Sequence, residues 1–240
     1  MDAEHVLVIG ATGGVGAALV ARLAARGARL TLAARAAARL TALAARYDAV
    51  AEPLAARAPD ALAAVVARAT ERAPLTGAVN LAGSVLLKPA YRTSVDEWRE
   101  VMAQNLDTAF HLMRAAPPKM KGGSIVLVAS AAATLGLANH AAIAAAKAGV
   151  IGLAISEAAT WAPRGVRVNV VAPGLVETPL TAKITGSEAA RSASIALHPL
   201  GRLGIPDDVA SAIAFLLHPD NGWITGQVLG VDGGLASAKR

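Results

Sequence analysis

The glycine-rich segment Gly10–Gly16 limits most strongly what this chain can fold into. It directly follows the apolar run 6–9, which is typical of a strand, and it opens a helical pattern over 14–26. Strand, glycine turn and helix together form the context in which such a motif binds a dinucleotide. Glycines let the backbone turn tightly against a pyrophosphate, and the first N–H groups of the helix point at the phosphate charge. A simple turn would explain the glycines, but it would not explain the strand pattern before them and the helical pattern after them. We therefore expect dinucleotide binding here.

The rest of the chain alternates between strand and helix patterns. Strands are expected at 5–9, 29–33, 77–81, 123–129, 166–171 and 227–231. Helices are expected between them at 14–26, 36–46, 59–72, 94–115, 139–161 and 206–217. Regular alternation favours a parallel, doubly wound sheet with helices on both faces. We therefore predict one α/β domain over residues 1–240.

Two segments do not follow this alternation. Residues 47–58 are short and irregular, and the sequence places no strand there firmly. Residues 178–205 carry Pro179, Gly186, Pro199 and Gly201, which is typical of an insertion or lid after a strand end. Ligands of open α/β sheets bind beyond the carboxyl ends of the strands, where a lid would cover them.

Composition excludes several classes of protein. The absence of cysteine rules out disulfides and thiolate chemistry, and we assign no metal site. Residues 1–5 are acidic and run into a strand, so no signal peptide is expected. Residues 122–146 are uncharged and long enough to span a membrane, but their glycines and polar residues fit a strand, a loop and a helix start better. We expect a soluble cytoplasmic protein with no membrane partner.

The net charge of +6 raises the question of a nucleic-acid partner. The basic residues, however, are mostly single arginines spread along helical patterns, as on solvated helix faces. No dense basic run, zinc-ligand spacing or stripe of aromatic residues accompanies them. We therefore expect no nucleic-acid function, and an anionic cofactor suits the charge balance equally well.

Several short motifs stand in order along nearly the whole chain: Gly10, Gly14 and Gly16, then residues 80–83, 169–178, 199–204 and 224–234. Together they resemble the motifs of the short-chain dehydrogenase/reductase family. Gly10, Gly14 and Gly16 match its glycine motif, and residues 80–83 (Asn-Leu-Ala-Gly) look like its Asn-Asn-Ala-Gly strand end. Residues 169–178, 199–204 and 224–234 are similar to its nicotinamide-side and C-terminal segments. The resemblance implies a Rossmann-like fold and a small-molecule substrate. It implies cofactor contacts from Gly10, Thr12, Gly13, Gly14, Val15, Gly16, Arg35, Asn80, Ala82, Gly83, Lys147, Pro173, Gly174, Val176 and Thr178.

The resemblance fails at one decisive position. The family's catalytic signature is Tyr-x-x-x-Lys on a helix, with a serine thirteen residues before the tyrosine. Lys147 and Ser130 stand at the matching positions, but residue 143 is isoleucine. Ile143 can neither donate nor accept a proton. Losing a general acid typically lowers a rate by about 10²–10⁴.

The remaining candidates each have a structural alternative. Asn105 matches a helix asparagine of the family, and it could equally bond only to helix backbone. Ser130 could contact the substrate oxygen or merely end a strand. His140, one turn before Ile143, could be an imidazole acid or an ordinary residue at a helix start.

Arg35 bears on the choice of cofactor. NAD(H) is selected by a carboxylate that grips the ribose 2′-OH, and the end of the second strand, 31–36, has none. A guanidinium there would pair with a 2′-phosphate. NADP(H) is therefore expected over NAD(H), although an exposed arginine at a helix start remains the alternative. Residues 51–54 also lack the family's usual aspartate at the adenine edge.

Two functions remain open from the sequence. The first is an atypical NADP(H)-dependent oxidoreductase acting on a carbonyl or hydroxyl group, in which water, Ser130, His140 or a substrate group moves the proton. The second is a non-catalytic protein of this fold that binds nucleotide, or that serves as a scaffold subunit by pairing with an active homologue in a mixed oligomer. Small residues at 144, 148, 152 and 159 permit close helix approach, and the resemblance implies a homodimer or homotetramer.

Overall fold

A computed structural model describes residues 4–54 and 59–238 of the chain. The expectations for residues 1–3, and for the part of 47–58 that follows residue 54, lie outside the described residues. Seven parallel strands form one sheet in the order β3-β2-β1-β4-β5-β6-β7. The strands are β1 (His5–Ile9), β2 (Arg29–Ala34), β3 (Val50–Pro53), β4 (Gly77–Asn80), β5 (Gly123–Val128), β6 (Val166–Pro173) and β7 (Val228–Val231).

The predicted doubly wound parallel sheet is confirmed. All six expected strands are present, with ends within two residues of those expected. The order reverses between β1 and β4, and this reversal is the switch point at which such sheets bind ligands.

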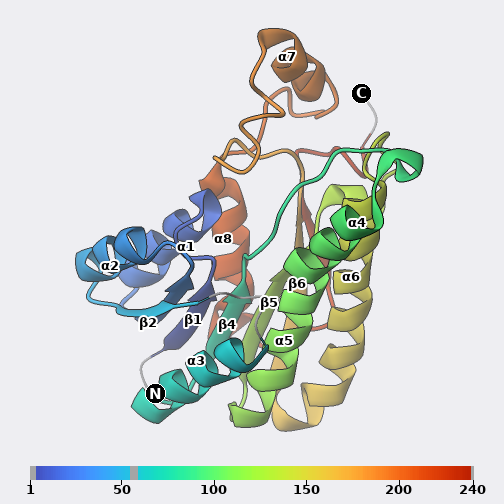
Figure 1. Ribbon diagram of the computed structural model, residues 1–240. Coiled ribbons are helices and arrows are strands. Elements are labelled where there is room, and N and C mark those ends of the chain that lie inside the picture. The colour runs from blue at the N-terminus through green and yellow to red at the C-terminus, as the bar shows by residue number, and fades with distance from the viewer. Residues whose placement is uncertain (1–3, 55–58, 239–240) are drawn as a thin grey trace.

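Helices cover both faces of the sheet, as Figure 1 shows. On one face lie α1 (Gly14–Ala25), α2 (Ala37–Arg46) and α8 (Pro206–Leu217). On the other lie α3 (Pro59–Arg72), α5 (Thr108–Ala115) and α6 (Ala141–Trp161). Alternate side chains of each strand enter opposite cores: Val6 and Val8 join the α1/α8 side, whereas Leu7 and Ile9 join the α3/α5/α6 side.

Strand β3 occupies the segment in which the sequence placed no strand firmly. It pairs with β2 from Val50 opposite Thr31 to Pro53 opposite Ala34. A four-residue edge strand tolerates a proline, which removes one N–H donor, so its sequence carries little strand signal. Glu52 of this strand is buried and bonds to Arg68 and Arg72 of α3. Burial opposes its ionisation, but these two guanidiniums outweigh burial and hold the pKa of Glu52 below its usual value.

The single helix expected over 94–115 is interrupted by a π-helical turn. Helix α4 (Val95–Met102) leads into the π-helical turn η2 (Ala103–Asp107), and η2 continues directly into α5. Ser94 caps α4, with Glu97 as the reciprocal partner in a capping box. Such π-turns occur frequently at functional sites, and this one contains Asn105.

The expected lid, 178–205, contains a short helix, α7 (Glu188–Ala196). In Figure 1 this segment stands above the carboxyl edge of the sheet. An ion pair between Arg191 of α7 and Glu177, at 2.9 Å, ties the helix to the base of the segment.

Helix α6 and the turn that follows it, Ala141–Arg164, are long and apolar enough to cross a membrane, by length and composition alone. The inner face of the helix packs on the sheet through buried residues such as Val150, Ala154 and Ala158. It therefore occupies the place of a core helix. Residues 122–146 form a strand, a loop and the start of this helix, as expected.

Arg167 of β6 closes the end of helix α8. Its buried guanidinium donates to the carbonyl oxygens of Leu216, Ile224 and His218 at 2.9, 3.1 and 3.2 Å. The last carbonyl groups of a helix have no hydrogen-bond donor within the helix. A cation beside them also interacts favourably with the negative end of the helix dipole. Burial lowers the pKa of Arg167 from its usual value.

We expect Arg167→Met to lower the free energy of unfolding by about 1.5–3 kcal/mol, the worth of hydrogen bonds to a charged group. The methionine keeps an apolar stem but leaves the carbonyl of His218 without this donor. Urea unfolding measures the change, with Lys121→Met as the control because Lys121 is exposed. Equal midpoints for both variants would show that this contact adds nothing.

Candidate active site

A cavity of about 580 Å³ opens at the carboxyl edge of the sheet, where the strand order reverses. Its walls come from the segments that follow β1, β2, β4, β5 and β6, together with α6 and the first residues of the 178–205 segment. Strand ends distant in sequence therefore contribute to one site.

The turn after β1 is built so that its backbone can approach a ligand closely. Gly10 has φ +82°, and a Cβ on it would lie 2.9 Å from the carbonyl carbon of Leu81. A Cβ on Gly16 would lie 2.4 Å from the Gly10 oxygen, which no side chain tolerates. No side chain caps the start of α1 at Gly13. The first N–H groups of α1 are therefore left to an anion, and a dinucleotide pyrophosphate fits this cradle.

Nearly all the residues expected at the cofactor line this cavity. They are Gly10, Thr12, Gly13, Gly14, Val15, Gly16, Arg35, Ala82, Gly83, Lys147, Pro173, Gly174, Val176 and Thr178. Thr178 lies over the start of α1, where a Cβ on Gly14 would come within 3.0 Å of its methyl carbon.

Asn80 is the exception, because its side chain is buried and does not line the cavity. Its amide oxygen accepts from the Ala82 N–H at 3.0 Å, and its amide nitrogen donates to the Thr108 hydroxyl at 3.1 Å. Asn80 therefore shapes the turn that carries Ala82 and Gly83, rather than facing a ligand itself.

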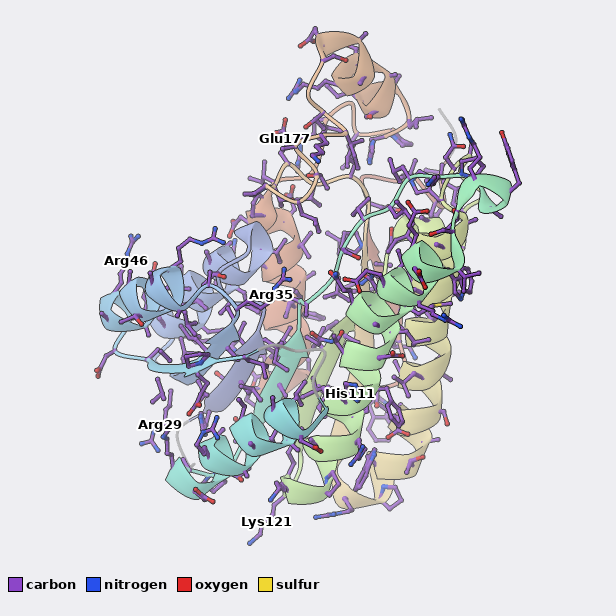
Figure 2. The ribbon with its side chains drawn as sticks, viewed as in Figure 1. Arg29, Arg35, Arg46, His111, Lys121 and Glu177 are labelled. Atoms are coloured by element: carbon purple, nitrogen blue, oxygen red, sulfur yellow. The ribbon has the colours of Figure 1, made fainter. Side chains whose placement is uncertain are left out.

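The end of the cavity beside β2 and β3 is lined by Arg35, Arg39 and Leu54. Figure 2 labels Arg35. No carboxylate is among the described residues that line the cavity, and Glu52 is bonded to α3 instead. Sequence reasoning missed Arg39, although a second arginine at the start of the helix that follows Arg35 was a usable signal.

At the opposite end, Lys147 lies on the floor of the cavity. Its Nζ donates to the Val128 carbonyl at 2.8 Å, and the side chain is 9% exposed. Burial lowers the pKa of Lys147 to about 8. A Cβ on Gly83 would lie 3.7 Å from Nζ, so the ammonium lies close to the ends of both β4 and β5.

Asn105 joins the π-turn to the loop after β4. Its amide nitrogen donates to the Val101 carbonyl at 2.9 Å and to the Ser84 hydroxyl at 3.1 Å. Its amide oxygen accepts from the Ser84 N–H at 3.2 Å. These bonds use both N–H donors of the Asn105 amide and one acceptor site on its oxygen. Asn105 therefore helps to fix the shape of the cavity that it lines. Ser84 also lines the cavity, and sequence reasoning had passed over it.

Ser130, just after β5, and Ile143, on α6, also line the cavity. The Ser130 oxygen accepts from the Ala132 N–H at 3.2 Å, which leaves its hydroxyl proton free to be donated. Ile143 is 5% exposed and packs in an apolar cluster with Val101 and Ala146.

His140 does not line the cavity. Its Nδ1 lies 2.7 Å from the Ala138 carbonyl oxygen, in the loop before α6. The spacing of one helical turn from Ile143 therefore does not bring the imidazole to the site.

The glycine cradle at the switch-point cavity is typical of an α/β protein that binds a dinucleotide. A family model described as enoyl-(acyl carrier protein) reductase matches residues 10–236. The chain belongs to the short-chain dehydrogenase/reductase family, as its motifs indicated, and this membership supports a nicotinamide cofactor.

Two curated relatives match along almost the whole chain. The 3-oxoacyl-[acyl-carrier-protein] reductase FabG of Vibrio cholerae is 36% identical over 98% of both chains. Galactitol 2-dehydrogenase (L-tagatose-forming) of Cereibacter sphaeroides is 38% identical over 98% of this chain and 95% of its own.

Solved structures agree with this assignment. A short-chain type dehydrogenase/reductase from Mycobacterium ulcerans superposes with a TM-score of 0.93 at 30% identity, over 97% of this chain and 90% of that one. A short-chain dehydrogenase/reductase from Brucella melitensis gives 0.92 at 33% identity, over 98% and 97%.

Proposed function

We propose that this protein is a cytoplasmic NADP(H)-dependent oxidoreductase that interconverts a carbonyl and a hydroxyl group on a small molecule, with Ile143 in place of the usual proton-transfer tyrosine. One observation carries the proposal. A single cavity holds the glycine turn, a guanidinium pair at one end, and Ser130 with Lys147 at the other.

Each part of the cavity has a task in this proposal. The start of α1 binds the pyrophosphate, and Arg35 and Arg39 bind the 2′-phosphate. The segment from Pro173 to Thr178 holds the nicotinamide side, and the bound cofactor supplies a hydride. Ser130 donates its hydroxyl proton in a hydrogen bond to the substrate oxygen and so orients the carbonyl.

The relatives support the reaction class. Their printed names include a 3-oxoacyl reductase, a galactitol 2-dehydrogenase and a cyclohexanol dehydrogenase, the last 40% identical over 60% of this chain. These names share oxidation and reduction between a carbonyl and an alcohol, and we assign the same chemistry here.

A second function is favoured by Ile143 alone. This residue packs with Val101, Ala142 and Ala146 as an ordinary core side chain would. A subunit that kept the fold and lost proton transfer would serve as a nucleotide-binding scaffold, in a mixed oligomer with an active homologue. Turnover by the protein on its own decides between the two functions.

Arg35→Ala should weaken NADPH binding about tenfold or more, because one charge-assisted phosphate contact contributes about 1.5–3 kcal/mol. NADH has no 2′-phosphate, so its affinity should not change. Calorimetry measures both, with Arg46→Ala as the control, since Arg46 lies outside the cavity (Figure 2). Equal native affinities for NADPH and NADH would remove Arg35 from this role.

The native protein should bind NADPH yet reduce simple ketones and 3-oxoacyl esters slowly. Ile143→Tyr should raise that rate about 10²-fold, the low end of a general-acid contribution. The matched control is Ile143→Phe, which adds the ring without the hydroxyl and should give no gain. NADPH absorbance follows both reactions. No turnover in the native protein or in Ile143→Tyr would favour the scaffold.

We also propose a homodimer or homotetramer. Helix α6 exposes small residues on one stripe, Ala148, Gly152 and Ala159, with half-exposed Ile155 among them. Close helix approach through this stripe would bury Ile155. Light scattering at micromolar concentration should give a multiple of the chain mass, and Gly152→Arg should reduce it. A monomeric native protein would contradict the proposal.

A further inference from the structure

The cavity offers very few groups that can exchange a proton near neutral pH. Among the described residues that line it, the titratable side chains are Arg35, Arg39 and Lys147. A guanidinium stays protonated at any ordinary pH, and serine or threonine hydroxyls are too weakly acidic to act alone. Lys147 is therefore the single group here that can both give and recover a proton.

The ammonium of Lys147 also has donors to spare. A lysine carries three N–H bonds, and within the described part of the chain its one hydrogen-bond acceptor is the Val128 carbonyl, at 2.8 Å. The side chain lines the cavity between the ends of β4 and β5. At least one N–H is therefore available to a ligand in the cavity.

Ile143 leaves the path to this ammonium open. Residues 143 and 147 share a face of α6, and both line the cavity. An isoleucine side chain ends short of where a phenol oxygen would lie. No hydroxyl from this helix position therefore stands between Lys147 and a substrate, and the substrate oxygen can take that place.

Among the described residues, no charged group pairs with Lys147. The groups that face it are the Val128 carbonyl and Ser130 from the end of β5, the Asn105 amide from η2, and the 83–84 loop. None of them is titratable. Burial without a counter-charge brings the pKa of Lys147 to about 8, close to the value that suits a general acid at neutral pH.

We propose that the Nζ of Lys147 donates the proton to the substrate oxygen. This inference rests on the proposed oxidoreductase function. During reduction, an Nζ–H bond breaks and an O–H bond forms while the carbonyl π pair moves to oxygen. The carbonyl carbon accepts the hydride that the reduced nicotinamide supplies, so the carbonyl is reduced and the nicotinamide oxidised. The neutral amine then regains a proton from water through the cavity mouth.

The pH dependence is the first test, and it uses the native protein. A general acid must be protonated, so kcat/KM for ketone reduction should fall about tenfold per pH unit above pH 8. Alcohol oxidation needs the neutral amine and should instead rise through the same pH. A reduction rate that stays level from pH 7 to 10 would overturn the proposal.

A second readout needs no turnover. In the ligand-free protein with ¹³C-labelled lysine, the Cε signal of Lys147 should titrate near pH 8, apart from the exposed lysines. Lys147→Arg assigns the signal by its disappearance. A midpoint near the usual value of about 10.4 would overturn the proposal, because the ammonium would then hold its proton too tightly.

A double-mutant cycle separates donating a proton from holding the cofactor. Lys147→Arg keeps the charge but cannot release a proton, so it should lower the native rate at least about 10²-fold. In the Ile143→Tyr background the phenol donates instead, and the same change should cost only a few-fold. NADPH affinity is measured for each variant. Equal losses in both backgrounds would overturn the proposal, since Lys147 would then only position the cofactor.

The outcomes also separate this inference from the function on which it rests. If neither the native protein nor Ile143→Tyr reduces any ketone, the oxidoreductase function fails and Lys147 as donor fails with it. If Ile143→Tyr is active and the native rate does not depend on pH or on Lys147, the donor role alone fails.

Discussion

The close contact between Gly16 and the Gly10 carbonyl is the constraint on which the rest of the site depends. A single added carbon at Gly16 would meet that oxygen at 2.4 Å. The contact presses the first turn of α1 against the end of β1, and Gly10 in turn lies against the end of β4. Every other wall of the cavity is placed relative to this corner, because the sheet fixes the spacing of its neighbours.

Much of the fold was readable from sequence because its signals are local. Apolar runs such as Val6–Ile9 and Ile125–Ala129 are bounded by glycines or polar residues, and the alternation of such runs with helical patterns predicts a parallel sheet. Strand β3 was not predicted firmly, because its four residues, which include Glu52 and Pro53, show no alternation of apolar and polar side chains. The π-turn at Ala103–Asp107 was not predicted, because one extra residue hardly changes the helical spacing of apolar residues in the sequence.

The candidate site was readable to a different extent. Motif spacing was enough to predict that Ser130, Ile143 and Lys147 share one site, and all three line the cavity. Spacing alone does not predict where a side chain points. Asn80 turned inward to Thr108, and His140 turned to its own loop. The environment of Lys147, including its burial and the lack of a counter-charge, depends on strands and helices remote in sequence. Only the assembled structure reveals it.

The π-turn sets the angle about the helix axis at which the side chains of α5 follow those of α4. Each residue of an α-helix advances the chain by about 100°, so one residue more or less swings everything beyond it to another side. Removing one residue from Ala103–Asp107 would leave α4 capped by Ser94, but it would turn Thr108 away from Asn80. The support beneath the 80–83 turn would then be lost, although every side chain involved was still present. Chain length at this point is therefore as much a determinant of the site as residue identity.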